Sequence, residues 1–84
     1  MPDETVLARI ESLVDEEHRL LRREADDAKD EQALADDRAR LDAIGVELDQ
    51  CWDLLRQRRA RRAAGQDPDE AAVRDARTVE SYRQ

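Results

Sequence analysis

The sequence contains few of the residues that fill a globular core or build tight turns. Aromatic residues make up 2% of the 84 residues, phenylalanine is absent, and there are only two glycines and two prolines. A β-fold needs many turns and many β-branched or aromatic strand residues, so this composition argues against one. A chain of this length buries only about 60% of the surface that its unfolded form exposes. We therefore expect a single domain with a thin core.

Long apolar runs and paired cysteines are also missing. No apolar segment approaches the roughly 20 residues of a membrane-spanning helix, and the N-terminal residues Met1-Pro2-Asp3-Glu4 do not form a basic leader. The one cysteine, Cys51, cannot form an internal disulfide. We therefore expect a cytoplasmic protein that has no membrane partner.

Charge, in contrast, is abundant and unevenly distributed. Charged residues make up 44% of the chain, and the wealth of Leu, Ala, Arg, Asp and Glu is typical of long helices and coiled coils. Residues 1–55 contain 7 basic and 17 acidic residues, a net charge of −10, whereas residues 56–84 contain 8 and 5, a net charge of +3. The C-terminal third is therefore the only part that could attract a polyanion.

Apolar residues recur at helical spacing in two segments that we predict to be helices, about 5–24 and about 31–64. The polar, aspartate-rich residues 25–30 between them favour a turn, although a continuous helix is the alternative because they contain no glycine or proline. The second segment repeats leucine every seven residues, which predicts a coiled-coil seam. The seam residues are Leu34, Leu41, Ile44, Leu48, Cys51, Trp52 and Leu55. We predict an all-α fold in which residues 1–65 form an antiparallel two-helix hairpin.

The remaining residues, 66–84, form a tail that starts after a helix stop. Gly65 is a typical residue just beyond a helix end. Asp67-Pro68 followed by acidic residues then predicts a short helix from Pro68 to about Arg74. The tail has three sizeable apolar residues with which it can dock, Val73, Val79 and Tyr82; the alternative is a mobile tail.

The lengths of the two predicted helices bear on assembly. Antiparallel pairing about a turn near Asp27 leaves the second helix a couple of turns longer than the first. Two helices that share one seam also leave part of each apolar stripe exposed. A second copy is the simplest cover, because two hairpins make a four-helix bundle and two-fold dimers are the commonest assemblies. We therefore predict a homodimer that forms through the leucine seam.

Three residues, Glu17, Asp37 and His18, are candidate metal ligands. Glu17 and Asp37 fall within the apolar stripes, and inward carboxylates on facing helices hold metal in di-iron bundles. The Glu-x-x-His pattern fails, however, because Asp15 lies outside the apolar stripe, His18 lies at its edge, and the chain has no second histidine. We therefore favour a structural role in which Glu17 pairs with Arg38 or Arg40, and a metal-binding bundle is the second alternative. No nucleophile and base stand at helical spacing, so we predict neither an enzyme nor a cofactor.

The end of the second helix carries a cluster of arginines, which could neutralise several phosphates of RNA or bind an acidic protein. The alternative is that these side chains scatter around the helix and pair with Asp3, Glu4 or tail residues of the same chain. The members of this arginine cluster are Arg56, Arg58, Arg59, Arg61 and Arg62.

Several segments resemble a known family. They are LVDEEHRL at residues 13–20, LDQCWDLLRQRRARR at residues 48–62 and AAGQDPDE at residues 63–70. Together they are similar to a family of short actinobacterial proteins that is classed as a domain of unknown function. The resemblance implies a bacterial cytoplasmic protein and brings no assigned activity, cofactor or partner.

Overall fold

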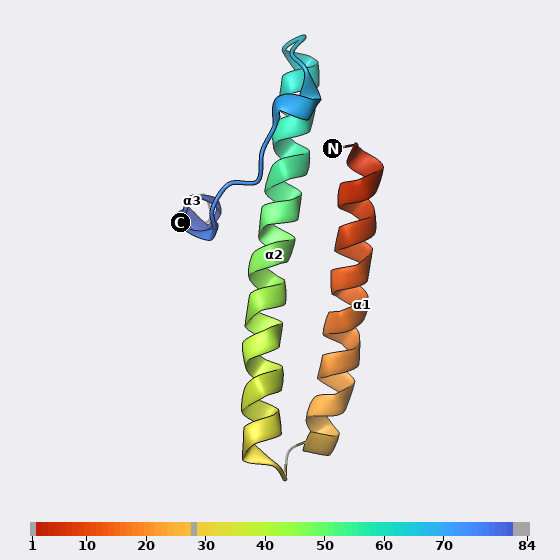
Figure 1. The fold of residues 1–84 in the computed structure, drawn as a ribbon, viewed down its shortest axis with the longest axis vertical. Helices are drawn as coiled ribbons and strands as arrows, with labels where there is room; N and C mark the ends of the chain where they lie inside the picture. Colours follow the sequence, from red (N-terminus) through yellow and green to blue (C-terminus); the bar gives the residue numbers. More distant parts are fainter. Residues whose placement is uncertain (1, 28, 82–84) are drawn as a thin grey trace.

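The computed structural model describes residues 2–27 and 29–81, and every regular element in this part of the chain is helical (Figure 1). The two long helices, α1 (Asp3–Asp27) and α2 (Glu31–Ala63), lie side by side and run antiparallel. A single turn of 3₁₀ helix, η1 (Pro68–Glu70), and a short helix, α3 (Ala76–Ser81), follow in the tail. The prediction of an all-α helical hairpin is confirmed.

The connection between the two long helices is shorter than the predicted turn. Helix α1 extends to Asp27, three residues beyond the predicted end at Glu24, and α2 begins at Glu31. Asp30 caps α2, because its Oδ1 accepts hydrogen bonds from the backbone N–H groups of Gln32 and Ala33, both at 3.1 Å. The alternative of one continuous helix is therefore wrong.

Helix α2 ends at Ala63, two residues before Gly65, the glycine that predicted its end. Gly65 has a φ of +72°, which favours a residue without a Cβ. The Gln66 N–H donates to the Arg61 carbonyl at 2.7 Å, and the Gly65 N–H donates to the Arg62 carbonyl at 3.1 Å. These bonds satisfy carbonyls at the end of α2 and turn the chain back along the helix.

The predicted helix from Pro68 to about Arg74 is wrong in its extent. Its first turn, η1, forms where the Asp67 side chain accepts the Asp69 N–H at 2.9 Å, but residues 71–75 have no regular secondary structure. Two glutamines of α2 bind this segment, since Gln57 and Gln50 donate to the carbonyls of Ala72 and Arg74 at 2.8 and 3.3 Å. These bonds take up carbonyls that a continuing helix would have used.

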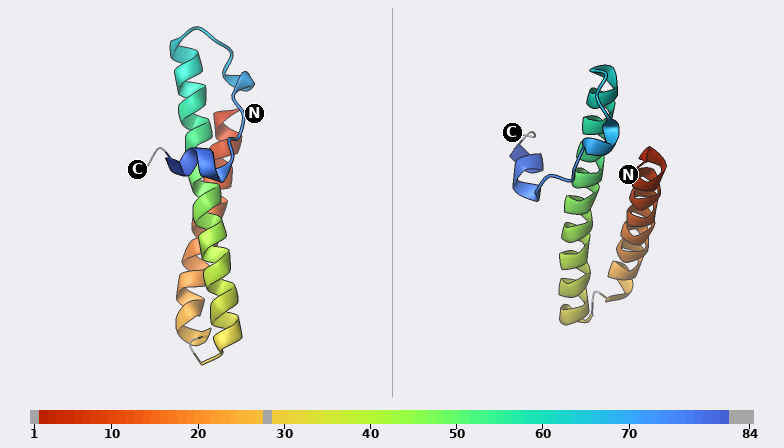
Figure 2. Two further views of the ribbon diagram at one scale, coloured as in Figure 1. Left: turned by 90° about the vertical axis from the view of Figure 1, so that its left-hand side faces the viewer. Right: turned by 45° about the horizontal axis from the view of Figure 1, so that its top comes forward.

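The tail then places α3 on the side of α2 that faces away from α1 (Figure 2). Val79 is buried there, whereas Val73 is exposed and Tyr82 lies outside the described residues. Of the two predicted docking residues that the structure describes, Val79 packs against the rest of the chain and Val73 does not.

The core is thin, as the composition predicts, and lies mainly between α1 and α2. Of the predicted seam, Ile44 is fully buried, Trp52 is exposed, and the other five residues are half-buried. The seam therefore faces α1 with one side and leaves the other side open. The buried apolar residues of the described chain are Val6, Ile10, Leu13, Leu20, Ile44, Leu54 and Val79.

None of the helices in the described part of the chain combines the length and the apolar character that crossing a bilayer requires.

Candidate functional site

The contact between α1 and α2 has two edges, which can be distinguished by heptad position. Positions a and d of each helix face the partner helix, while e and g flank them on opposite sides. The fully buried Leu13 and Ile44 occupy d positions. In an antiparallel pair, the g positions of both helices meet at one edge and the e positions meet at the other.

The edge formed by the g positions is charged and internally paired. Arg9 contacts Glu47 at 2.6 Å, and Arg40 contacts Glu16 at 2.6 Å and Glu47 at 3.7 Å. The hydrogen bond from Arg40 holds the pKa of Glu16 below its usual value. This edge is therefore satisfied within the chain.

The edge formed by the e positions exposes apolar residues in its central part and carries charged residues towards the ends of α2. Leu7 is 45% exposed, Leu21 is 51% exposed and Trp52 is 47% exposed, although all three are large hydrophobic residues. Between them lie the half-buried Val14 and Gly45, and nothing lies within 4 Å of the point where a Cβ on Gly45 would stand. We call these five residues the apolar edge. It is continuous with the open side of the half-buried leucines of the seam.

The structure does not bring the three metal candidates together. Asp37 is buried and its carboxylate contacts Arg23 at 2.5 Å, so a guanidinium already occupies the position that a cation would take. His18 is exposed and Glu17 is half-buried. No group of three or more potential metal ligands is found among residues 2–27 and 29–81.

The two arginines predicted to pair with Glu17 contact other carboxylates of α1 instead. Arg40 contacts Glu16, and Arg38 contacts Glu24 at 3.3 Å. Glu17 therefore remains as a half-buried carboxylate beside the apolar edge.

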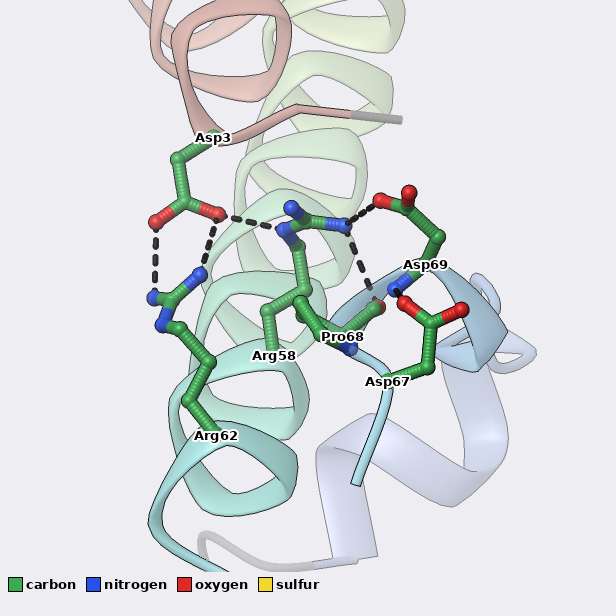
Figure 3. Close-up of polar contacts among 6 residues, drawn as sticks. All are labelled: Asp3, Arg58, Arg62, Asp67, Pro68 and Asp69. Atoms are coloured by element: carbon green, nitrogen blue, oxygen red, sulfur yellow. Dashed lines mark hydrogen bonds and ion pairs between the residues drawn. The ribbon is translucent and has the colours of Figure 1, made fainter. Parts of the chain in front are cut away.

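The arginine cluster is largely neutralised by carboxylates of the same chain. Arg58 is 5% exposed and lies between two elements (Figure 3). Its Nε donates to Asp3 at the start of α1, and its Nη1 donates to Asp69 at 2.9 Å and to the Pro68 carbonyl at 3.1 Å. The Arg58 side chain therefore connects α2 to both α1 and η1 through hydrogen bonds.

Two further arginines of the cluster reinforce the same arrangement. Arg62 donates to both carboxylate oxygens of Asp3 at 3.2 and 2.8 Å, and Arg61 contacts Glu70 at 3.3 Å. The hydrogen bonds from Arg62 and Arg58 lower the pKa of Asp3 to about 2. Arg56 and Arg59 are exposed, and neither has an ion-pair partner among the side chains that the structure describes. Two of the five arginines thus remain available to another molecule.

A buried ion pair between α2 and the tail was not predicted from the sequence. Asp53 is fully buried, and Arg74 donates to both of its carboxylate oxygens. Gln57 donates to Asp53 at 2.9 Å, and these hydrogen bonds, Arg74's first, hold its pKa below the usual value. The sequence nevertheless contains a signal for a polar contact at this place. Gln50, Asp53 and Gln57 are polar residues spaced three or four apart, so they share one face of α2 that lies outside the seam.

An open groove of about 710 Å³ lies beside this ion pair, between α2 and the tail. The groove has Asp53 and Arg74 in its lining, so two of its charges are already paired. The residues that line it are Asp49, Trp52, Asp53, Arg56, Gln57, Ala60, Arg74 and Val79. This arrangement lacks the nucleophile, base and orienting group of a catalytic site among the described residues.

Cys51 is half-buried in the hairpin interface and packs against the core. Burial raises the pKa of its thiol. A thiol with a raised pKa is a weak nucleophile at neutral pH, so Cys51 acts as a small apolar residue.

Comparison with known proteins identifies a matching family and similar chains. A model of the family described as "Protein of unknown function (DUF2630)" matches residues 2–84. Uncharacterized protein Rv0898c of Mycobacterium tuberculosis and uncharacterized protein Mb0922c of Mycobacterium bovis are each 49% identical to the chain over 83 residues. Each alignment covers 95% of this chain and 88% of the relative. No solved structure matches the chain.

Proposed function

The chain belongs to the DUF2630 family of proteins of unknown function, and we propose that it is a non-enzymatic helical interaction protein that self-associates through the apolar edge. The observation that carries this proposal is the contrast between the two edges of the hairpin. One edge is lined by ion pairs within the chain, and the other exposes Leu7, Leu21 and Trp52. Exposed apolar residues that gather on one face favour association with a protein surface.

A second copy of the chain supplies such a surface without a further component. The exposed residues of the apolar edge share one heptad position, and the half-buried leucines of the seam lie beside them. A hairpin with this pattern can bury the apolar edge by forming a four-helix bundle. The proposed complex is therefore a homodimer, and its interface combines the apolar edge with the open side of the predicted seam.

The mass of the full chain in solution tests this proposal. Size-exclusion chromatography with light scattering at high micromolar concentration should report about twice the 9.7 kDa of one chain. The variant Leu7→Ser/Leu21→Ser should shift the mass towards one chain, because it removes the two most exposed leucines. The matched control, Ala8→Ser/Arg22→Ser, changes two exposed positions on the outer face of α1 and should remain dimeric. A wild-type mass of 9.7 kDa would contradict the proposal.

Binding of RNA is the second candidate function, and the exposure of Arg56 and Arg59 favours it. Three of the five arginines are already neutralised by Asp3, Asp69 and Glu70, which lowers the charge that the cluster offers to phosphates. If RNA binds here, its affinity should fall as salt concentration rises and should fall further in Arg56→Gln/Arg59→Gln. Binding that is insensitive to both changes would exclude this site.

A further inference from the structure

The residues at the e positions of each long helix are arranged symmetrically in sequence about the middle of that helix. In α1 the e positions carry Leu7, Val14 and Leu21, so a leucine stands seven residues to either side of the valine. In α2 the e positions carry, in order, Glu31, Arg38, Gly45, Trp52 and Arg59. A glutamate and an arginine thus stand 14 residues to either side of Gly45. In a two-fold interface residue i meets residue j of the partner while j meets i, so the leucines of α1 and the Glu31–Arg59 pair of α2 are self-complementary, and Arg38 of each protomer meets Trp52 of its partner.

We propose that a second copy packs antiparallel on the apolar edge, about a two-fold axis that passes beside Val14 and Gly45, so that Arg59 of each protomer pairs with Glu31 of its partner. This inference rests on the self-association proposed above and specifies its register. Each leucine at position 7 would then meet the leucine at position 21 of the other copy.

The pairing of α1 with α2 within one hairpin allows the same two-fold axis to pass beside the middle of both helices. The pairs Arg9–Glu47 and Glu16–Arg40 connect α1 to α2 across the charged edge. They place Val14 level with Gly45 to within about one helical turn of 3.6 residues. The centre of the leucine pattern in α1 and the centre of the charge pattern in α2 therefore lie within about one helical turn of each other along the hairpin.

Gly45 is suited to the point where two α2 helices cross. It lies in the middle of a helix, where glycine is less favourable than alanine, and its φ is not positive. The structure of one chain gives no reason for a glycine there, because nothing lies within 4 Å of an added Cβ. Two facing copies of Gly45 would let the helix backbones approach closely.

The charge distribution favours an antiparallel copy over a parallel one. Between Glu24 and Asp37 the chain has seven acidic residues and one basic residue, whereas between Arg56 and Arg62 it has five arginines and no acidic residue. Arg59 and Glu31 are both exposed, and neither has an ion-pair partner among the described side chains. An antiparallel copy brings each basic end to an acidic end, while a parallel copy brings like charges together.

Charge reversal tests the register. Arg59→Glu and Glu31→Arg should each raise the dissociation constant of the dimer at least tenfold, as measured by sedimentation equilibrium at low salt. The double variant Arg59→Glu/Glu31→Arg should return it to within about threefold of the wild-type value, because the pair is re-formed with opposite polarity. The control Arg22→Glu makes the same charge change on the outer face of α1 and should leave the constant within threefold of the wild-type value. Circular dichroism checks that each variant is helical.

Cross-linking provides an independent measurement of the same register. In a Cys51→Ser background, a mixture of Glu31→Cys chains and Arg59→Cys chains should form a disulfide-linked heterodimer on mild oxidation. A disulfide between two Arg59→Cys chains in preference to the mixed product would overturn the antiparallel arrangement. A dimer whose dissociation constant does not respond to charge reversal would overturn the register but not self-association, and a monomeric wild type would overturn both.

Discussion

Asp53 and Arg58 are two of the three charged residues that are buried in the described part of the chain, and Asp37 is the third. Asp53 is 0% exposed and Arg58 is 5% exposed. A buried charge is costly unless other groups solvate it, and both residues meet this condition. Asp53 accepts from Arg74 and Gln57, and Arg58 donates to two carboxylates and a carbonyl. Each of them connects α2 to another segment, so at the scale of residues the molecule is assembled by buried ion pairs as well as by its thin apolar core.

Removing the partner of Asp53 should destabilise the fold and release the tail. Arg74→Ala leaves a buried carboxylate with fewer donors, and we expect a loss of about 1–3 kcal/mol in the free energy of unfolding. Denaturation in urea measures this loss, and limited proteolysis should show faster cleavage within residues 66–75. Arg77→Ala, which truncates an exposed arginine of α3, is the control. Equal effects of the two substitutions would show that the buried pair does not hold the tail.

The pKa of Asp3 predicts how stability depends on pH. Its pKa is about 2 in the folded chain, below the value of about 3.9 for an unfolded aspartate. A lowered folded pKa means that the ionised carboxylate stabilises the fold above pH 4 and that this contribution is lost as pH falls towards 2. Urea denaturation at several pH values should therefore show that Asp3→Asn lowers stability at pH 7 and that the difference shrinks by pH 2. The exposed outer-face variant Asp15→Asn should show no such difference.

At the scale of elements, the helices whose ends depend on local sequence were predictable, and the conformation of the tail was not. The ends of α2 are set by the Asp30 cap and by Gly65, and both signals are visible in the sequence. The conformation of residues 71–75 depends on donors from Gln50 and Gln57, which lie 15 to 24 residues away. Local propensity favoured continuing the helix to Arg74, and these tertiary hydrogen bonds override it.

The glycine at the end of α2 should be less tolerant of substitution than the glycine within it. Gly65→Ala forces a Cβ into the left-handed region and should cost about 1 kcal/mol. The Cβ added by Gly45→Ala has no atoms within 4 Å, and the substitution removes a glycine that destabilises the helix. It should therefore raise the free energy of unfolding of the isolated chain by up to about 1 kcal/mol. Urea denaturation at low micromolar concentration compares the two variants. A loss of stability in both would mean that Gly45 is needed within the single chain.

At the scale of the whole molecule, the sequence predicted the helical hairpin, but it predicted only in part which residues of the hairpin are buried, paired or exposed. The seam was predicted as one stripe, and the structure divides it between a side that packs on α1 and a side that stays open. The arginine cluster was predicted as a single basic patch or as intrachain pairs, and the structure pairs Arg58, Arg61 and Arg62 within the chain. These divisions depend on the rotation of α2 about its own axis and on the path of the tail. Neither can be obtained from the spacing of residues along one helix.

Glu17 provides a test of the bundle as a whole. It is half-buried and lies beside the apolar edge, where the proposed dimer would bury it further. Glu17→Leu replaces a charged side chain with an apolar one. It should make the free energy of dimerisation more favourable by about 1–2 kcal/mol, because the dimer buries the two methyl groups of leucine. Sedimentation equilibrium measures the change, and Asp15→Leu on the outer face is the control. Weaker association in Glu17→Leu would show that the carboxylate has a specific partner in the interface.

The position of Arg58 also has a consequence for the order in which the chain folds. The contacts near the turn of a helical hairpin join residues that are close in sequence, and those loops close at the lowest entropic cost. The contact of Arg58 with Asp3 joins residues 55 positions apart, and that of Arg62 with Asp3 joins residues 59 positions apart. Closing so long a loop is favoured once the rest of the hairpin has formed. The contacts of Arg58 and Arg62 with Asp3 therefore form late in folding, so they slow unfolding and leave the folding rate almost unchanged.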